Sequence, residues 1–150
     1  MKLLLAIDES DYSRAALDAA TELGGPAGTS ALLITCVRSD TYLAGEIYAQ
    51  AAQEIEELVR AEIERAEARL RTLVPELEAA GVSVKTLVMR GDPRFAIVDT
   101  AKEEKTDLIV VGSHGRSGLK KLLLGSVASH VVTHAPCSVL VAKAPKVARA

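Results

Sequence analysis

The sequence has 150 residues, a length that fits one domain with a substantial buried core. Hydrophobic residues make up 49% and charged residues 25%, which is typical of a globular protein, but aromatic residues make up only 3% and tryptophan is absent. Stacking platforms for single-stranded nucleic acid are therefore lacking, and a formal net charge of -2 disfavours any nucleic-acid backbone as a partner. We expect a single domain over residues 1–150 with an aliphatic core.

The first ten residues, MKLLLAIDES, predict a strand rather than a targeting or membrane segment. Only five apolar residues follow Lys2 before Asp8, which is too short for a signal peptide or a membrane span. Cys36 and Cys137 lie far apart in apolar runs, so they indicate buried thiols and neither a redox pair nor a zinc site. We expect a cytoplasmic protein that does not enter a membrane.

Five short apolar runs predict the strands of a parallel sheet. They are nearly continuous rather than alternating, which is typical of strands buried on both faces. The runs are KLLLAI (2–7), ALLITCV (31–37), SVKTLVM (83–89), DLIVVG (107–112) and SVLVAK (138–143). Helical patterns separate them, so the chain is expected to fold as a Rossmann-like, doubly wound α/β sandwich with helices on both faces of the sheet.

Two of the helical segments carry clear start and stop signals. Ser10 can cap a helix that ends at the two glycines at 24 and 25. Asp92 is a natural N-cap, and Pro93 then occupies the first helical position, where its missing N–H is harmless.

The longest helical pattern runs from about residue 44 to residue 80, with apolar residues alternately three and four apart. Because Pro75 lies inside it, we expect a kink or break near Leu73. The loop before this helix is unusually apolar around Tyr42 and Tyr48, which favours a surface for protein contacts.

Residues 110–129, VVGSHGRSGLKKLLLGSVAS, read as neither ordinary core nor ordinary surface. Glycines can let backbone approach a ligand, and a helix that starts near Ser126 offers free N–H groups and a positive dipole end to an anion. Ligands of doubly wound sheets bind outside the carboxyl ends of the strands, so Asp8 and the loop at Gly112 are expected to face one crevice. The spacing matches neither the P-loop nor the dinucleotide fingerprint, and the glycines alone indicate a structural turn as readily as a phosphate site.

The whole pattern G-x2-G-x9-G-[ST], present as Gly112, Gly115, Gly125 and Ser126, closely resembles that of the universal stress protein family. The flanking stretches DLIVVGSHG and HAPCSVLVAK, together with LLLAIDESDYSRAAL and GDPRFAIVDTAKEEK, extend the likeness over nearly the entire chain. The resemblance implies a five-stranded sheet in the order 3-2-1-4-5 and a homodimer formed through the last strand, here the region of Ser138 to Ala142. It also implies a stress-response protein that binds ATP or AMP and signals through protein partners that the sequence does not identify.

The resemblance further assigns positions around the nucleotide. Asp8 would lie by the adenosine, the backbone of Val37 would meet the adenine, and Gly112 would approach the ribose and α-phosphate. The residues implied at the site are Ile7, Asp8, Val37, Val111, Gly112, His114, Gly115, Gly125, Ser126 and Val127. Some relatives carry Ser or Thr where this chain has Ala128, so one phosphate contact is lost unless Ser129 replaces it. Mg2+ could arrive with the triphosphate.

Simpler interpretations compete with several of these assignments. Asp8 could cap the following helix, and His114 could be a solvated loop residue. His130 and His134 have the spacing of two zinc ligands, but the glutamate of HExxH is missing, which favours ordinary helix-end histidines. Lys120 and its neighbour Lys121 could draw phosphates into the crevice or simply be solvated.

Two other functions stay open at this point. The same pocket could serve a slow ATPase or an autophosphorylating enzyme, although no residue is assigned as catalytic. Alternatively, the chain could be a nucleotide-free interaction module in which the glycine loop is only architecture. Nucleotide carried through purification would distinguish these classes, because the absence of tryptophan makes an adenine band easy to see.

Overall fold

The computed structural model describes residues 1–38, 49–115 and 124–143 of the chain. Strands and helices alternate along it. In chain order they are β1 (Lys2–Ala6), α1 (Asp11–Leu23), β2 (Ser30–Val37), α2 (Ala49–Ala79), β3 (Ser83–Arg90), α3 (Pro93–Glu103), β4 (Leu108–Gly112), α4 (Ser126–His134) and β5 (Ser138–Ala142). The apolar loop around Tyr42 and the pair Lys120 and Lys121 lie outside the described residues.

The five strands form one parallel sheet in the order β3-β2-β1-β4-β5, which confirms the expected topology. The central strand is β1, in which Leu4 pairs with Leu32 of β2 on one side and with Ile109 of β4 on the other. Leu3, Leu4 and Leu5 are all fully buried. Both faces of β1 are therefore covered, which explains why its apolar run is continuous rather than alternating.

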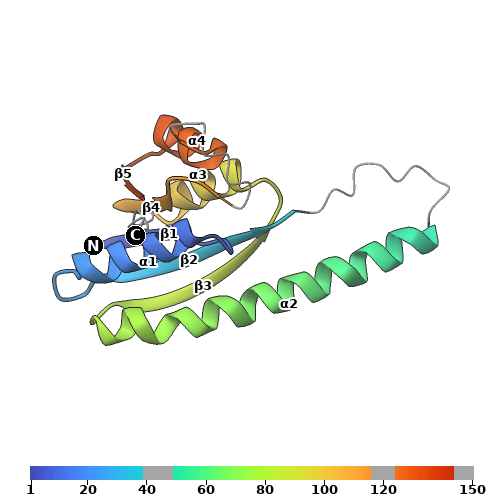
Figure 1. Ribbon diagram of the computed structural model, residues 1–150, viewed down its shortest axis with the longest axis horizontal. Coiled ribbons are helices and arrows are strands. Elements are labelled where there is room, and N and C mark those ends of the chain that lie inside the picture. Colours follow the sequence, from blue (N-terminus) through green and yellow to red (C-terminus); the bar gives the residue numbers. More distant parts are fainter. Residues whose placement is uncertain (39–48, 116–123, 144–150) are drawn as a thin grey trace, which may run out of the picture.

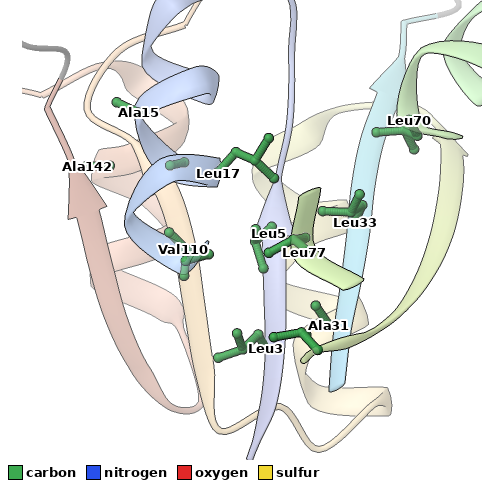
Figure 2. Close-up of a cluster of buried hydrophobic side chains, with 13 residues drawn as sticks. Leu3, Leu5, Ala15, Leu17, Ala31, Leu33, Leu70, Leu77, Val110 and Ala142 are labelled. Carbon is green, nitrogen blue, oxygen red and sulfur yellow. The ribbon is translucent and has the colours of Figure 1, made fainter. Parts of the chain in front are cut away.

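In the described part of the chain, α1 and α2 cover one face of the sheet, and α3 and α4 cover the other (Figure 1). On one face, α1 and α2 bury a cluster that includes Leu5, Leu17, Leu33 and Leu77 (Figure 2). On the other face, α3 and α4 pack on Leu4, Ile34 and Ile109 through residues that include Ile97 and Val131. Because these side chains are aliphatic, the core has the composition expected from a sequence so poor in aromatic residues.

The predicted helix signals are confirmed at α1 and α3. Ser10 is the N-cap of α1, since its hydroxyl accepts a hydrogen bond from the backbone N–H of Ser13, and Gly24 ends the helix with a φ of 50°. Asp92 caps α3 by accepting from the N–H of Arg94 at 2.9 Å, with Pro93 as the first helical residue. Each cap fixes the entry of a helix at the same edge of the sheet.

Acid should weaken the start of α3 in a defined pH range. A hydrogen bond from the Arg94 side chain lowers the pKa of Asp92 to about 2, below its value of about 3.9 in an unfolded chain. The ionised form is thus favoured by folding, so its contribution is present above about pH 4 and is lost as the pH falls toward 2. Asp92→Asn keeps a capping oxygen and removes the ion pair.

We expect Asp92→Asn to lower the urea midpoint only slightly at pH 7, because an exposed ion pair contributes little to the free energy of unfolding. The difference from the wild type should shrink as the pH falls below 4. Urea unfolding curves recorded between pH 3 and pH 7 measure this difference. A gap between the two proteins that stays constant with pH would contradict the assigned ion pair.

Pro75 does not break the long helix, because α2 runs continuously through it to Ala79. Pro75 is exposed near the carboxyl end of the helix, where it removes a single backbone hydrogen bond. Leu70 before it and Leu77 after it are fully buried against the sheet. Burial of the final turn therefore outweighs the local penalty of the proline.

Among the described residues, no helix combines the length and apolarity needed to cross a membrane.

Candidate functional site

A cavity of about 290 Å³ opens at the carboxyl ends of β1, β2 and β4. The starts of α1, α3 and α4 complete its walls. The lining residues are Ala6, Ile7, Asp8, Ser13, Ile34, Thr35, Cys36, Arg38, Pro93, Ile97, Val111, Gly112, His114, Gly115, Gly125, Ser126, Val127 and Ala128. In a doubly wound sheet, ligands bind at this edge, beside the point where the strand order reverses. Here that point lies between β1, whose next strand along the chain is β2 on one side, and β4, whose next strand is β5 on the other.

The structure brings together all but one of the residues that the sequence assigned to the site. Ile7 and Asp8 follow β1, Val111 and Gly112 end β4, and the others belong to the glycine loop and the start of α4. The exception is Val37, which does not line this cavity. Segments separated by more than half of the chain thus meet at one edge of the sheet.

Val37 lies instead in the wall of a smaller cavity of about 180 Å³ that adjoins the first. Its side chain is buried with Val59 and Ala66 of α2, and its carbonyl accepts a hydrogen bond from the N–H of Gly91 at 3.0 Å. The neighbouring residues Cys36 and Arg38 line both cavities. Val37 thus lies beside the first cavity rather than in its wall, and the adenine contact expected at its backbone stays a prediction.

The carboxylate of Asp8 is held by the first turn of α1. Its Oδ1 accepts hydrogen bonds from the Ser10 N–H at 2.9 Å, from the Ser10 hydroxyl, and from the Ser13 hydroxyl at 2.6 Å. Ser10, not Asp8, is the N-cap of the helix. Asp8 thus holds the capping residue through one oxygen and also lies in the cavity wall, while ligand contact at Asp8 stays a prediction.

Each of the three motif glycines lies in close contact with another part of the chain. A Cβ atom on Gly112 would lie 2.7 Å from Cβ of Tyr12 and 2.8 Å from its backbone carbonyl. A Cβ on Gly125 would lie 3.1 Å from Cα of His114, and one on Gly115 would lie 3.0 Å from Oδ2 of Asp8. None of the three adopts a positive φ. Their role in the fold is close approach of β4, α1, α4 and the glycine loop.

The first turn of α4 borders the cavity without a side-chain cap. Gly125 occupies the N-cap position and makes no side-chain hydrogen bond, and Ser126, Val127 and Ala128 follow it along the cavity wall. Such a helix start combines unpaired N–H groups with the positive end of the helix dipole, which favours an anion. Ser129, whose hydroxyl was expected as a substitute for the one that Ala128 lacks, is exposed and does not line the cavity, whereas Ala128 does.

The remaining polar groups of the cavity wall include a thiol, an imidazole and a guanidinium. Burial raises the pKa of the Cys36 thiol to about 11, which keeps it protonated near neutral pH. His114 places Nδ1 3.2 Å from the Ser113 hydroxyl, and its ring centroid lies 5.1 Å from that of Tyr12. Arg38 is exposed at the rim. In the part of the chain that the structure describes, no three His, Cys, Asp or Glu side chains gather as metal ligands do.

His130 and His134 lie on α4 away from this cavity. Their rings stack with centroids 4.1 Å apart, and Nδ1 of His134 lies 2.9 Å from the carbonyl oxygen of His130. Phe95 of α3 contacts the His130 ring edge to face at 5.0 Å. The pair is thus accounted for by helix and ring contacts.

Sequence reasoning missed several residues of the cavity wall. One of them is Ser13, the last residue of DESDYS (8–13). The spacing of Asp8 and Ser13 in this stretch could have indicated a network of side-chain hydrogen bonds at the helix start. Ile34, Pro93 and Ile97 supply an apolar side of the cavity, and no local signal marks them, because they read as ordinary strand and helix residues. Their place in the wall depends on how α3 packs against β2.

A parallel five-stranded sheet with this strand order, covered by two helices on each face, defines a Rossmann-like α/β sandwich. The chain belongs to the universal stress protein family, whose sequence profile matches residues 1–143. One similar relative is universal stress protein Sll1388 of Synechocystis sp. Its sequence is 32% identical to this chain over 147 residues, which cover 93% of this chain and 96% of the relative.

Solved structures agree with this assignment. The solved structure of protein MJ0577 of Methanocaldococcus jannaschii superposes on this chain with a TM-score of 0.83 at 29% sequence identity. The superposition covers 97% of this chain and 96% of the MJ0577 chain. A universal stress protein solved in complex with cAMP superposes with a TM-score of 0.68 at 25% identity, covering 96% and 97%. The similarity therefore extends over nearly the whole length of all these chains.

Proposed function

We propose that this protein binds an adenine nucleotide, and ATP in particular, in the cavity at the carboxyl ends of β1, β2 and β4. The observation that carries the proposal is the uncapped start of α4, which opens on the same cavity as Asp8. The volume of about 290 Å³ is near the lower end of the ~300 to 1,000 Å³ typical of small-molecule sites. A relative of the same fold and family was solved with cAMP, which contains the same base and sugar.

The chemistry of the walls suggests how the nucleotide would lie. Ile34, Pro93 and Ile97 form an apolar side suited to a purine ring. The N–H groups of the first turn of α4 suit the phosphates. Asp8 lines the same cavity and suits the sugar, whose hydroxyl groups can donate hydrogen bonds to a carboxylate. A divalent ion such as Mg2+ would be held mainly by the phosphates of the nucleotide.

The proposal extends to a homodimer formed through β5. In the described part of the chain this strand pairs only with β4, which leaves one edge of the sheet at β5 available for another strand. Its apolar residues Val139, Leu140 and Val141 are only partly buried. We propose that such a dimer acts in the cytoplasm as a stress-response protein whose partners recognise the nucleotide-bound form.

A negative charge at the start of α4 tests the proposal. Ser126 is exposed and is the first residue of the helix, so Ser126→Asp is compatible with the helix dipole and with folding. Its carboxylate would compete with phosphates for the same N–H groups and would repel them. We expect ATP to bind the nucleotide-free wild type with micromolar affinity and the variant at least about tenfold more weakly.

Isothermal titration calorimetry with ATP, AMP and cAMP, with and without Mg2+, measures these affinities. Ser129→Asp is the matched control, because Ser129 is also exposed near the start of α4 but does not line the cavity. It should leave the ATP affinity within about threefold of the wild type. Absence of ATP binding to the wild type, or equal binding by Ser126→Asp, would refute the site.

A further inference from the structure

The hydroxyl of Ser13 makes two hydrogen bonds to Asp8. It donates to Oδ1 of the carboxylate at 2.6 Å and accepts from the backbone N–H of the same residue at 2.7 Å. Ser13 is buried, with only 6% of its surface exposed, although it lines the cavity. Its donor and acceptor capacity is therefore directed at one residue rather than at solvent.

The remaining contacts of the carboxylate leave its two oxygens in different environments. Ser10 adds two more donors, its N–H and its hydroxyl, and both bind Oδ1. The other oxygen, Oδ2, lies on the side of Gly115, where an added Cβ would be 3.0 Å away. Three donors thus fix the rotation of the carboxylate, and the glycine leaves room for Oδ2 at the cavity wall.

A carboxylate held in this way accepts hydrogen bonds and repels anions. Its partner in a nucleotide must then be a donor, which leaves a sugar hydroxyl or the amino group of the base. Gly115 belongs to the loop that packs against Gly125 at the start of α4, because the N of Gly115 would be 3.6 Å from a Cβ on Gly125. Oδ2 therefore lies close to the expected phosphate region, and the part of a nucleotide next to its phosphates is the sugar.

We infer that Ser13 is a positioning residue that orients Oδ2 of Asp8 toward a sugar hydroxyl and thereby makes the site select ribonucleotides over deoxyribonucleotides. The inference rests on the proposed function, since it concerns the same cavity. Discrimination by a hydrogen bond to a fixed carboxylate can be large, because a ligand without the hydroxyl leaves this partly buried acceptor without that partner. If Ser13 is removed, Oδ1 keeps only the two donors of Ser10, so the carboxylate is held less firmly and that discrimination is reduced.

The test compares ATP with 2′-deoxy-ATP and 3′-deoxy-ATP by calorimetry on nucleotide-free protein. We expect the wild type to bind ATP about tenfold or more tightly than at least one of the two analogues. In Ser13→Ala the affinity for ATP should fall while that for the same analogue changes little, so the ratio approaches one. A purely structural role of Ser13 would weaken all three ligands equally and leave the ratio unchanged.

Two further variants sharpen the comparison. Thr21→Val removes a hydroxyl from the same helix, where it donates to the Leu17 carbonyl at 2.9 Å, and should keep the wild-type ratio. Ser13→Thr retains a hydroxyl and should restore most of the discrimination. If circular dichroism shows that Ser13→Ala is unfolded, Ser13→Cys, with a similar volume and a weaker donor, takes its place and should also reduce the ratio.

The outcomes separate the two proposals. A wild type that does not bind ATP defeats the proposed function, and this inference with it. A wild type that binds ATP and both deoxy analogues equally leaves the proposed function intact and overturns the inference. An unchanged ratio in folded Ser13→Ala also overturns it.

Discussion

Alanine at position 112 is expected to lower the free energy of unfolding by about 3 kcal/mol or more, although it adds only one methyl group. The new Cβ would lie 2.7 Å from Cβ of Tyr12 and 2.8 Å from the carbonyl carbon and oxygen of the same residue. Two of these three atoms belong to the backbone of α1, so no side-chain rotation can relieve the contact. Because Gly112 has no positive φ, the predicted loss comes from this contact and not from backbone strain.

The other motif glycines provide graded controls for this prediction. Gly125→Ala brings its Cβ to 3.1 Å from Cα of His114, so a smaller shift relieves it. Gly115→Ala meets only Oδ2 of Asp8 at 3.0 Å, at the end of a side chain. Urea unfolding should therefore rank Gly112→Ala as the least stable of the three. Equal stability of Gly112→Ala and Gly115→Ala would contradict the close contact between β4 and α1.

Leu77→Ala is expected to lower the free energy of unfolding by about 3 kcal/mol. Leu77 is fully buried in the cluster of Figure 2, two residues beyond Pro75. Its truncation removes apolar burial and leaves a space that neighbouring side chains can fill only in part. The effect should be large because this side chain holds the last turn of α2 on the sheet beyond the proline.

Leu58→Ala is the matched control on the same helix. The Leu58 side chain is 68% exposed, so the same substitution should change stability by less than about 0.5 kcal/mol. Thermal or urea unfolding of both variants gives the comparison. Similar losses in the two variants would mean that α2 is not anchored at its carboxyl end in the way described.

The fold was largely predictable because its signals are local and mutually consistent. Continuous apolar runs indicated strands covered on both faces, and the burial of Leu3, Leu4 and Leu5 confirms this directly. The strand order came from the family pattern rather than from the runs themselves, since no local signal states which strands are neighbours. The effect of Pro75 could not be predicted for a related reason, because its local penalty is outweighed by the burial of Leu77, which depends on tertiary packing.

The site was predictable where backbone and glycine signals mark it, and less so where side chains from other elements complete it. Asp8 and Ser126 stand at strand and helix ends that sequence patterns can locate. Cys36 and Ile97 reach the cavity only because of the register of β2 and the packing of α3. The Ser13 network depends on side-chain hydrogen bonds across a helix start, which a pattern can suggest but not orient.

The pairing of β1 also bears on when the protein can fold during synthesis. Of the five strands, β1 is synthesised before the others, and Leu3 can pair with Ala31 of β2 soon after that strand follows. Its other neighbour is β4, in which Leu108 pairs with Leu3, so the centre of the sheet stays open on one side until that later segment has emerged. Contacts of such long sequence separation slow folding, and the nascent chain exposes an unpaired strand edge meanwhile. Protection of that edge by chaperones would matter most while residues 38 to 107 are being translated.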